Sequence, residues 1–207
     1  MKRHRQCYMR SALAVIALAS LPIAASQDAV VQQYAGNGTQ NTRPFTVTQG
    51  WEIQWDASGD IFQLYLHTAS GDLVDVAANQ MGSGSGASYF PKPGTYYLQV
   101  NAIGPWALRV VNLAAGPAQI SNAPVTFRGN GTSNTRPFTS LGPWEVQWDA
   151  SGDVFQVFVQ DGSGNLLDVA ANQLGPGRGA SYQPRSGTYY LQVNATGAWS
   201  LQVVPVR

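Results

Sequence analysis

The chain has 207 residues, of which 44% are hydrophobic and only 11% are charged, with a formal net charge of +1. Four of its twelve Lys and Arg residues lie in the first ten positions, which leaves eight basic against eleven acidic residues, a formal charge of −3. This balance, with no basic run beyond the N-terminus, argues against binding to nucleic acid or to an anionic membrane surface. The 22 glycines, nine tyrosines and six tryptophans favour folded β-structure over disorder.

Residues 1–26 are predicted to be a signal peptide. Basic residues precede an apolar run from Ala12 to Leu21, and small residues follow up to the predicted cleavage after Ser26. The apolar run is about half the roughly 20 residues that a membrane-spanning helix needs. We therefore expect a secreted or periplasmic protein rather than an integral membrane protein. The single cysteine, Cys7, lies within the signal, so no disulfide is expected.

The rest of the chain contains one duplicated unit. Adding 93 to each number aligns 36–112 with 129–205 without a gap, and 51 of these 77 positions are identical. We predict a mature N-terminal segment at 27–33, a first domain at 34–112, a linker at 113–126 and a second domain at 127–207. A unit of this size can enclose a small core of its own.

Two strands are predicted from the alternation of apolar and polar residues in WEIQWDA and IFQLYLH, at 51–57 and 61–67. Their apolar residues, including Trp51 and Trp55, are predicted to face the core. A hairpin with its tip at Ser58-Gly59 would place Trp55 opposite Phe62. The second copy allows the same register.

A second hairpin is predicted around the loop at 69–71, with Val74 opposite Leu66 and Val76 opposite Leu64. In the second copy, Leu167 would lie opposite Val159. Further strands are predicted at 88–90, 95–101 and 106–111, with one at 43–48 before them. Short strands, glycine-rich turns and no helical segment predict an all-β chain of two tandem antiparallel, jelly-roll-like β-sandwich domains.

The motif WDASGD occurs at 55–60 and again at 148–153. In the predicted hairpin Asp56 and Asp60 point to opposite faces, so they do not form a carboxylate dyad. We interpret the motif as a turn, because Asp and Ser bond to nearby backbone and Gly accepts a positive φ. The alternative is a calcium site in which Asp60 acts with Asp72 or Asn79 from other loops.

Catalytic residue sets are scarce in the sequence. The mature part has one histidine, His67, and the second copy has Gln160 there, so neither a catalytic triad nor a Cys/His zinc site is expected. Glu52 and Asp56 would lie about 13 Å apart along a strand, beyond the roughly 9.5 Å limit of an inverting glycosidase pair. We expect no enzymatic activity, cofactor or metal, with a glycoside hydrolase as the less favoured alternative.

One outward face could bind a ligand. If three strands are adjacent, Glu52 and Asp75 lie on either side of Tyr65, about 9.6 Å apart. An aromatic ring flanked by amides and carboxylates can hold a sugar, although an ordinary solvated sheet face is the alternative. The predicted ligand-binding residues are Glu52, Gln54, Gln63, Tyr65 and Asp75 in the first copy, and Glu145, Gln147, Gln156, Phe158 and Asp168 in the second.

A family resemblance rests on three features: GTYYLQV at 94–100 and 187–193, the paired tryptophans of WEIQW and WEVQW, and the closing tryptophan strand. Together they resemble the bacterial extracytoplasmic β-sandwich domains of the pre-peptidase C-terminal type. The resemblance implies a non-catalytic accessory role. We therefore expect an exported binding or structural module, and the alternative is a carbohydrate-binding protein. The partner would be a polysaccharide or a component of the cell surface or matrix.

Overall fold

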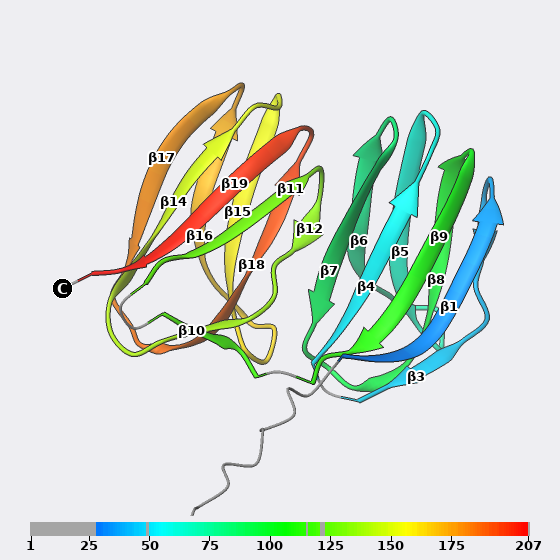
Figure 1. Cartoon of the computed structure of the whole chain (residues 1–207), viewed down its shortest axis with the longest axis horizontal. Helices are drawn as coiled ribbons and strands as arrows, with labels where there is room; N and C mark the ends of the chain where they lie inside the picture. Colours follow the sequence, from blue (N-terminus) through cyan, green and yellow to red (C-terminus); the bar gives the residue numbers. More distant parts are fainter. Residues whose placement is uncertain (1–27, 49, 115, 121–122, 207) are drawn as a thin grey trace, which may run out of the picture.

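The computed structural model describes residues 28–48, 50–114, 116–120 and 123–206, and within these ranges the secondary structure is all β. Two similar sandwich units lie side by side (Figure 1). The predicted signal peptide and its cleavage site lie outside the described residues. No helix in the described ranges is long and apolar enough to cross a membrane.

The first unit consists of two packed sheets. One has the strand order β1-β9-β4-β7, and the other has the order β2-β8-β5-β6 with β3 also paired to β8. All of these pairings are antiparallel. The strands are β1 (Ala29–Asn37), β2 (Gln40–Asn41), β3 (Phe45–Val47), β4 (Trp51–Ala57), β5 (Ile61–Thr68), β6 (Leu73–Met81), β7 (Gly84–Phe90), β8 (Gly94–Ile103) and β9 (Pro105–Asn112).

The second unit repeats this arrangement. One sheet has the order β11-β19-β14-β17 and the other the order β10-β13-β18-β15-β16, with β12 also paired to β18. The β10–β13 pair is parallel. The strands are β10 (Ala118–Ile120), β11 (Val125–Asn130), β12 (Ser133–Asn134), β13 (Phe138–Ser140), β14 (Trp144–Ala150), β15 (Val154–Asp161), β16 (Leu166–Leu174), β17 (Gly177–Gln183), β18 (Gly187–Ala195) and β19 (Ala198–Pro205).

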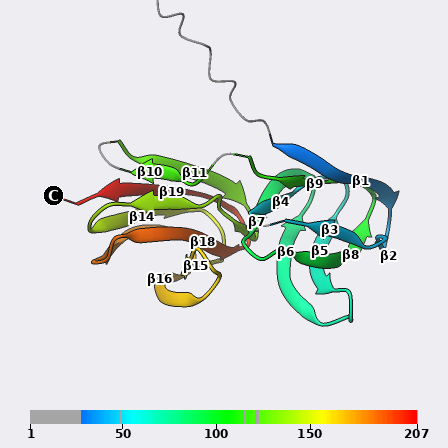
Figure 2. The ribbon, with the colours of Figure 1, turned by 90° about the horizontal axis from the view of Figure 1, so that it is seen from below.

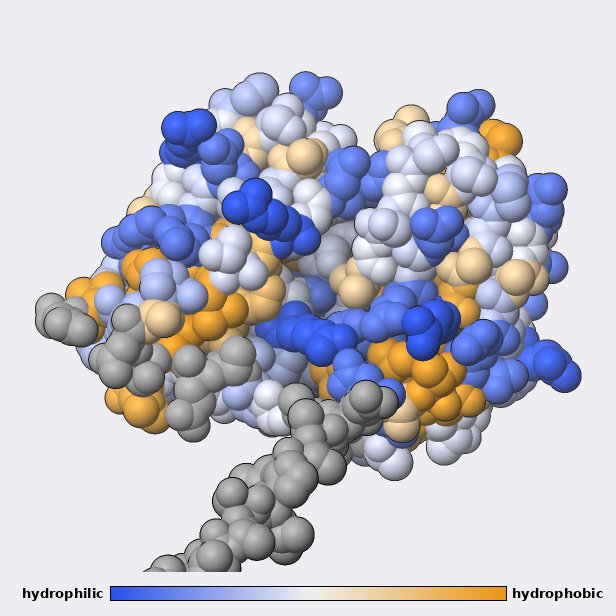
Figure 3. Space-filling model, viewed as in Figure 1, coloured by the Kyte–Doolittle hydropathy of each residue, from blue (hydrophilic) through white to orange (hydrophobic). Residues whose placement is uncertain are grey.

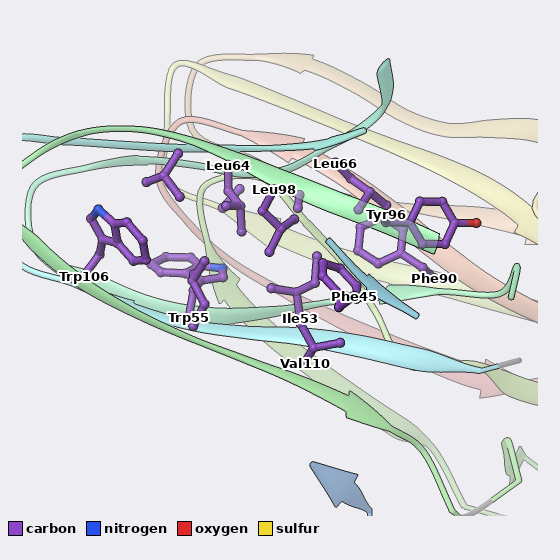
Figure 4. Packing of buried hydrophobic residues seen from close by; sticks show 14 of the residues in the cluster. Phe45, Ile53, Trp55, Leu64, Leu66, Phe90, Tyr96, Leu98, Trp106 and Val110 are labelled. Atoms are coloured by element: carbon purple, nitrogen blue, oxygen red, sulfur yellow. The ribbon is translucent and has the colours of Figure 1, made fainter. Parts of the chain in front are cut away.

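Each unit has its own hydrophobic core between its two sheets. In the first unit Trp55 and Ile53 point inward from β4 and meet Leu64 and Leu98 from the opposite sheet (Figure 4). The alternation predicted this inward face correctly, because residues two apart on a strand share a face. Trp51 lies fully buried at the same face, and its indole Nε1 donates to the Lys92 carbonyl at 2.9 Å.

The predicted hairpin at Ser58-Gly59 is wrong. Strand β4 pairs with β7 and β9, whereas β5 pairs with β6 and β8, so the WDASGD segment crosses from one sheet to the other. Trp55 and Phe62 do meet, with ring centroids 5.1 Å apart, but across the core rather than side by side in one sheet. Gly59 has a φ of 146°, and a Cβ there would clash with the Ile103 carbonyl.

The hairpin around the loop at 69–71 is present, because β5 and β6 pair and Gly71 has a φ of 99°. Its register differs from the prediction. Leu66 lies opposite Asp75 and Leu64 opposite Ala78, because a bulge interrupts the ladder. In the second unit Val159 lies opposite Asp168 in the same way, not opposite Leu167. Val74 and Leu167 are consequently exposed.

Two segments predicted to lie outside the domains contain strands. Strand β1 begins at Ala29 and pairs with β9 along its length, although 27–33 was predicted to be an N-terminal segment. Strand β10 lies within the predicted linker, and its Ile120 is buried in the second core. Neither segment shows a sustained alternation of polar and apolar residues, so the sequence pattern did not indicate these strands.

Candidate functional site

The predicted ligand face is divided between two sheets. Glu52 and Gln54 lie on the outer face of β4, and Gln63 and Tyr65 lie on the outer face of β5, on the opposite side of the sandwich. Asp75 lies opposite the buried Leu66 rather than beside Tyr65. The predicted arrangement is therefore wrong, because it required β4 and β5 to be neighbours. The second unit shows the same division: Glu145 and Gln147 lie on β14, Gln156 and Phe158 on β15, and Asp168 on β16.

The outer face of β5 instead carries a row of hydrogen-bonded amides. Gln63 Nε2 donates to Asn79 Oδ1 at 3.3 Å, and Asn101 Nδ2 donates to Gln63 Oε1 at 2.8 Å. Tyr65 lies half-buried on the same face. The second unit repeats the row: Gln156 donates to Asn172 at 3.2 Å and accepts from Asn194 at 2.9 Å. Cross-strand pairs of this kind stabilise a sheet, and they hold the amides in a fixed row on the same face as the ring.

The two predicted acidic residues with the most partners, Glu52 and Asp75, lie where the two units meet. Strands β6 and β7, at the edge of the first sandwich, contact β11 and β12 at the edge of the second. Figure 2 shows β7 next to the second unit, and hydrophilic residues cross the junction in Figure 3. We call this contact between the units the joint.

Arg136 of the second unit binds the Glu52 carboxylate at the joint with two nitrogens. The Nε–Oε2 distance is 2.7 Å and the Nη2–Oε1 distance is 3.1 Å. Nη2 also donates to Asp28 Oδ2 at 2.9 Å. Glu52 is only 3% exposed, whereas the Arg136 side chain is about half-exposed. The hydrogen bonds from Arg136 to Glu52 raise the pKa of the guanidinium, which therefore keeps its charge at the joint.

Asp75 accepts hydrogen bonds from two side chains of the second unit. Asn134 Nδ2 donates to Oδ2 at 2.9 Å, and Gln192 Nε2 donates to Oδ1 at 2.9 Å. The Val76 amide also donates to Oδ1 at 2.8 Å. Burial raises the pKa of Asp75 above its ordinary value, because desolvation outweighs these hydrogen bonds.

Backbone groups and an aromatic pair complete the joint. The Asn134 amide donates to Ser88 Oγ at 3.2 Å, and Asn134 Nδ2 donates to the Tyr89 carbonyl at 3.2 Å. The Ser133 hydroxyl donates to the Ala87 carbonyl. Tyr89 and Tyr190 pack edge to face with ring centroids 5.3 Å apart. Burial raises the pKa of both tyrosines, and the nearby Asp75 charge raises that of Tyr190 further.

A cavity of about 190 Å³ lies at the joint, with residues of both units in its wall. A carboxyl group with a perturbed pKa in a cavity is a candidate functional group, although structural hydrogen-bond networks produce the same signature. Here the polar wall residues bond to one another across the joint. The wall includes Asp75, Phe90, Pro91 and Tyr96 of the first unit, and Tyr190 and Gln192 of the second.

The raised pKa of Asp75 predicts a specific pH dependence. Its contribution to the free energy of unfolding is fully present below the unfolded-state pKa, about 3.9, and is lost as the pH rises through the higher folded-state pKa. Asp75→Asn is expected to remove this loss, so melting curves of wild type and variant should converge in acid and separate above about pH 4. The matched control is Asp168→Asn, at the exposed counterpart, which should leave the pH dependence in place. A wild-type and Asp75→Asn difference that is constant with pH would contradict the assignment.

The joint residues of the second unit were not predicted from the sequence. Asn134 and Arg136 belong to GNGTSNTRPFT, which nearly repeats GNGTQNTRPFT of the first copy. The signal that could have indicated these residues is the near identity of this polar segment in the two copies, although the segment has no apolar alternation. Sequence alone does not show which copy of the segment is buried.

Asp60 and Asp72, two residues of the alternative calcium site, are separated. Asp60 precedes β5 and Asp72 follows it, so the two carboxylates lie at opposite ends of an eight-residue strand. Asp72 accepts from the Ser70 hydroxyl at 2.8 Å within its own turn. Among the described residues no group of three or more His, Cys, Asp or Glu side chains is placed to hold a metal ion.

No protein-family model matches the chain, and no curated protein sequence matches it. Among solved structures, the PBSX exported protein XepA is 12% identical, with 86% of this chain and 85% of that chain covered and a TM-score of 0.32. The protein YhaK from Escherichia coli is 11% identical, with 87% and 86% covered and a TM-score of 0.28. The stem and receptor-binding domain of spike protein P1 from bacteriophage PM2 is 9% identical, with 88% and 80% covered and a TM-score of 0.20.

Proposed function

We propose that the chain is a non-catalytic structural module, exported from the cell, whose two sandwich units are held in a fixed relation by the joint. The observation that supports this proposal is that the acidic side chains at the joint bind residues of the other unit. Glu52 is bound by Arg136, and Asp75 is bound by Asn134 and Gln192, all from the other unit. Carboxylates that could serve as acid or base are thus engaged in holding the units together.

The sequence supports the same proposal. The GTYYLQV segments and paired tryptophans resemble the pre-peptidase C-terminal type of domain, which is usually a non-catalytic accessory. The basic and apolar segments of residues 1–26 support export. Two domains linked by an ion pair and by side-chain hydrogen bonds suit a protein that connects or supports other molecules.

A second candidate function is carbohydrate binding on the outer face of β5 and β15. The observation that favours it is the placement of half-buried Tyr65 and Phe158 beside rows of fixed amides. Such a ring can stack on the CH face of a sugar while the amides bond to hydroxyls. Glu52, Gln54, Glu145 and Gln147 lie on the opposite face and take no part in this version of the site.

Retention on a broad glycan array and turnover of a polysaccharide panel test both candidates. For the structural module we expect neither retention nor turnover by the wild type. If the wild type is retained on a glycan, the combined Tyr65→Ala and Phe158→Ala variant is expected to lose about 10-fold or more in affinity, since each stacking surface contributes about 0.5 to 1.5 kcal/mol.

Gln54→Ala combined with Gln147→Ala, on the opposite face, is the matched control for this experiment. Retention that the aromatic variant loses and the control keeps, with unchanged melting temperatures, would replace the structural proposal by the carbohydrate-binding one. Turnover of any polysaccharide by the wild type would contradict both.

A further inference from the structure

The duplication places a second copy of each half of the joint at an outer end of the molecule. The first unit contributes β6 and β7 to the joint, and their counterparts β16 and β17 lie at the far edge of the second unit (Figure 1). The second unit contributes β11 and β12, and their counterparts β1 and β2 lie at the far edge of the first unit. We call these the β17 end and the β1 end.

The side chains that form the joint are repeated at these ends almost without change. On the β17 end the carboxylates and the tyrosine of the joint recur. On the β1 end its arginine, asparagine, glutamine and tyrosine recur. The counterparts of Glu52, Asp75, Ser88 and Tyr89 are Glu145, Asp168, Ser181 and Tyr182; those of Asn134, Arg136, Tyr190 and Gln192 are Asn41, Arg43, Tyr97 and Gln99.

These repeated residues are less buried at the ends than at the joint. Tyr89 is 6% exposed at the joint, whereas Tyr182 is 54% exposed at the β17 end. Asp168 and Gln99 are likewise exposed, although their counterparts at the joint are partly buried. The outer ends therefore present, to solvent, the surface that the molecule buries between its own units.

The joint cavity is also repeated in part. A cavity of about 280 Å³ at the β17 end is lined by Leu167, Asp168, Gln183, Pro184, Arg185 and Tyr189. These six residues are the counterparts of the first unit's Val74, Asp75, Phe90, Pro91, Lys92 and Tyr96 in the joint cavity. The β17 end thus has one half of the cavity wall. The other half, which at the joint includes Tyr190 and Gln192, has its counterparts Tyr97 and Gln99 at the β1 end.

Where the ends differ from the joint, the differences compensate in size. Ser85 and Arg128 both line a second cavity between the units, so the first unit contributes a small residue to this cavity and the second a long one. At the outer ends the counterparts are Arg178 and Ala35, a long residue and a small one. Each of these two pairs, Ser85 with Arg128 and Arg178 with Ala35, therefore contains one arginine and one small residue.

The polar contact that positions the glutamine is also kept. At the joint Gln160 Nε2 donates to Gln192 Oε1 at 3.1 Å. At the β1 end His67 Nε2 lies 3.1 Å from Gln99 Oε1, so a different residue holds the counterpart glutamine in the same place. Ser133 is replaced by Gln40, which retains a donor group.

We propose that the chain associates head to tail with further copies of itself, the β17 end of one copy binding the β1 end of the next through the contacts seen at the joint. Arg43 would bind Glu145, Asn41 and Gln99 would bind Asp168, and Tyr97 would pack on Tyr182. The two surfaces are different and lie at opposite ends of the molecule. After each addition the assembly therefore still has one free β17 end and one free β1 end, which gives an open linear assembly. This inference rests on the proposed structural function and names its partner.

The joint between copies is weaker than the joint within the chain. It lacks the covalent connection, which by itself provides an effective concentration on the order of millimolar. Association is therefore expected to depend on protein concentration.

Sedimentation of the purified full-chain product, from about 10 μM to about 1 mM, tests the proposal. We expect the mean mass of the wild type to rise with concentration. Glu145→Arg alone and Arg43→Glu alone should each lower the association constant by roughly 100-fold, because each places like charges opposite one another. An equimolar mixture of the two variants should restore association, since the arginine introduced in one variant faces the glutamate introduced in the other and the remaining ends are unchanged.

Tyr182→Ser, which changes an exposed side chain, provides a second variant should either charge reversal fail to fold. It is expected to be monomeric with an unchanged melting temperature. A wild type that stays monomeric at 1 mM, or association that survives both charge reversals, would overturn the proposal. The sedimentation experiment uses no glycan or substrate, so its outcome does not depend on the glycan experiments. Glycan retention or turnover would contradict the proposed function without changing the test of self-association.

Discussion

Arg136→Ala is expected to lower the free energy of unfolding by about 2–3 kcal/mol. The variant leaves Glu52, 3% exposed, without the guanidinium that binds both of its carboxylate oxygens. Removing one partner of a fully buried ion pair costs about 3–5 kcal/mol. We expect less here because the Arg136 side chain is about half-exposed, which admits water to the remaining charge.

Arg43→Ala is the matched control, because Arg43 occupies the corresponding position at the β1 end. Its effect is expected to stay within about 0.5 kcal/mol at low protein concentration, as for most surface substitutions. Calorimetry of both variants at a few micromolar provides the measurement. Equal losses in the two variants would show that the ion pair at the joint does not stabilise the folded chain.

Trp55→Ala is expected to cost about 3–5 kcal/mol, as truncation of a buried large aromatic residue does. The Trp55 side chain is 4% exposed, contacts Phe62 across the core and lies so close to Gly86 that a Cβ there would come within 2.6 Å of the ring. Alanine would leave a cavity where the indole was, because the side chains of a close-packed core move only partly into such a space.

Trp148→Ala, the same change in the second unit, is the comparison. Trp148 packs on Phe155 with ring centroids 5.3 Å apart, but it is only partly buried. We expect a smaller loss, about 2 to 3 kcal/mol, because less of its surface is removed from water. Denaturant unfolding of each variant measures the difference. A Trp55→Ala protein that keeps the wild-type midpoint would contradict the packing of the first core.

The β class, the duplication and the inward face of the strands could all be predicted from the sequence. Trp51, Ile53 and Trp55 alternate with polar residues, and alternation fixes which face of a strand is buried. Alternation does not determine which strand lies beside it in the sheet. Trp55 meets Phe62 whether β4 and β5 pair in one sheet or face each other from two, so the prediction chose a hairpin where the structure has a crossing between sheets.

The role of the polar residues could not be predicted from the sequence, because it depends on how the two units dock. Glu52 and Glu145 have nearly the same neighbours in sequence, WEIQW and WEVQW, yet docking of the second unit buries Glu52 and leaves Glu145 partly exposed. The same holds for Tyr89 and Tyr182. Burial of a polar side chain depends on which surface is brought against it. A charged residue on the outer face of a sheet is compatible with either environment as long as a partner such as Arg136 can reach it. The local sequence is nearly the same in both units, so the position of each unit in the chain decides which copy becomes part of the joint.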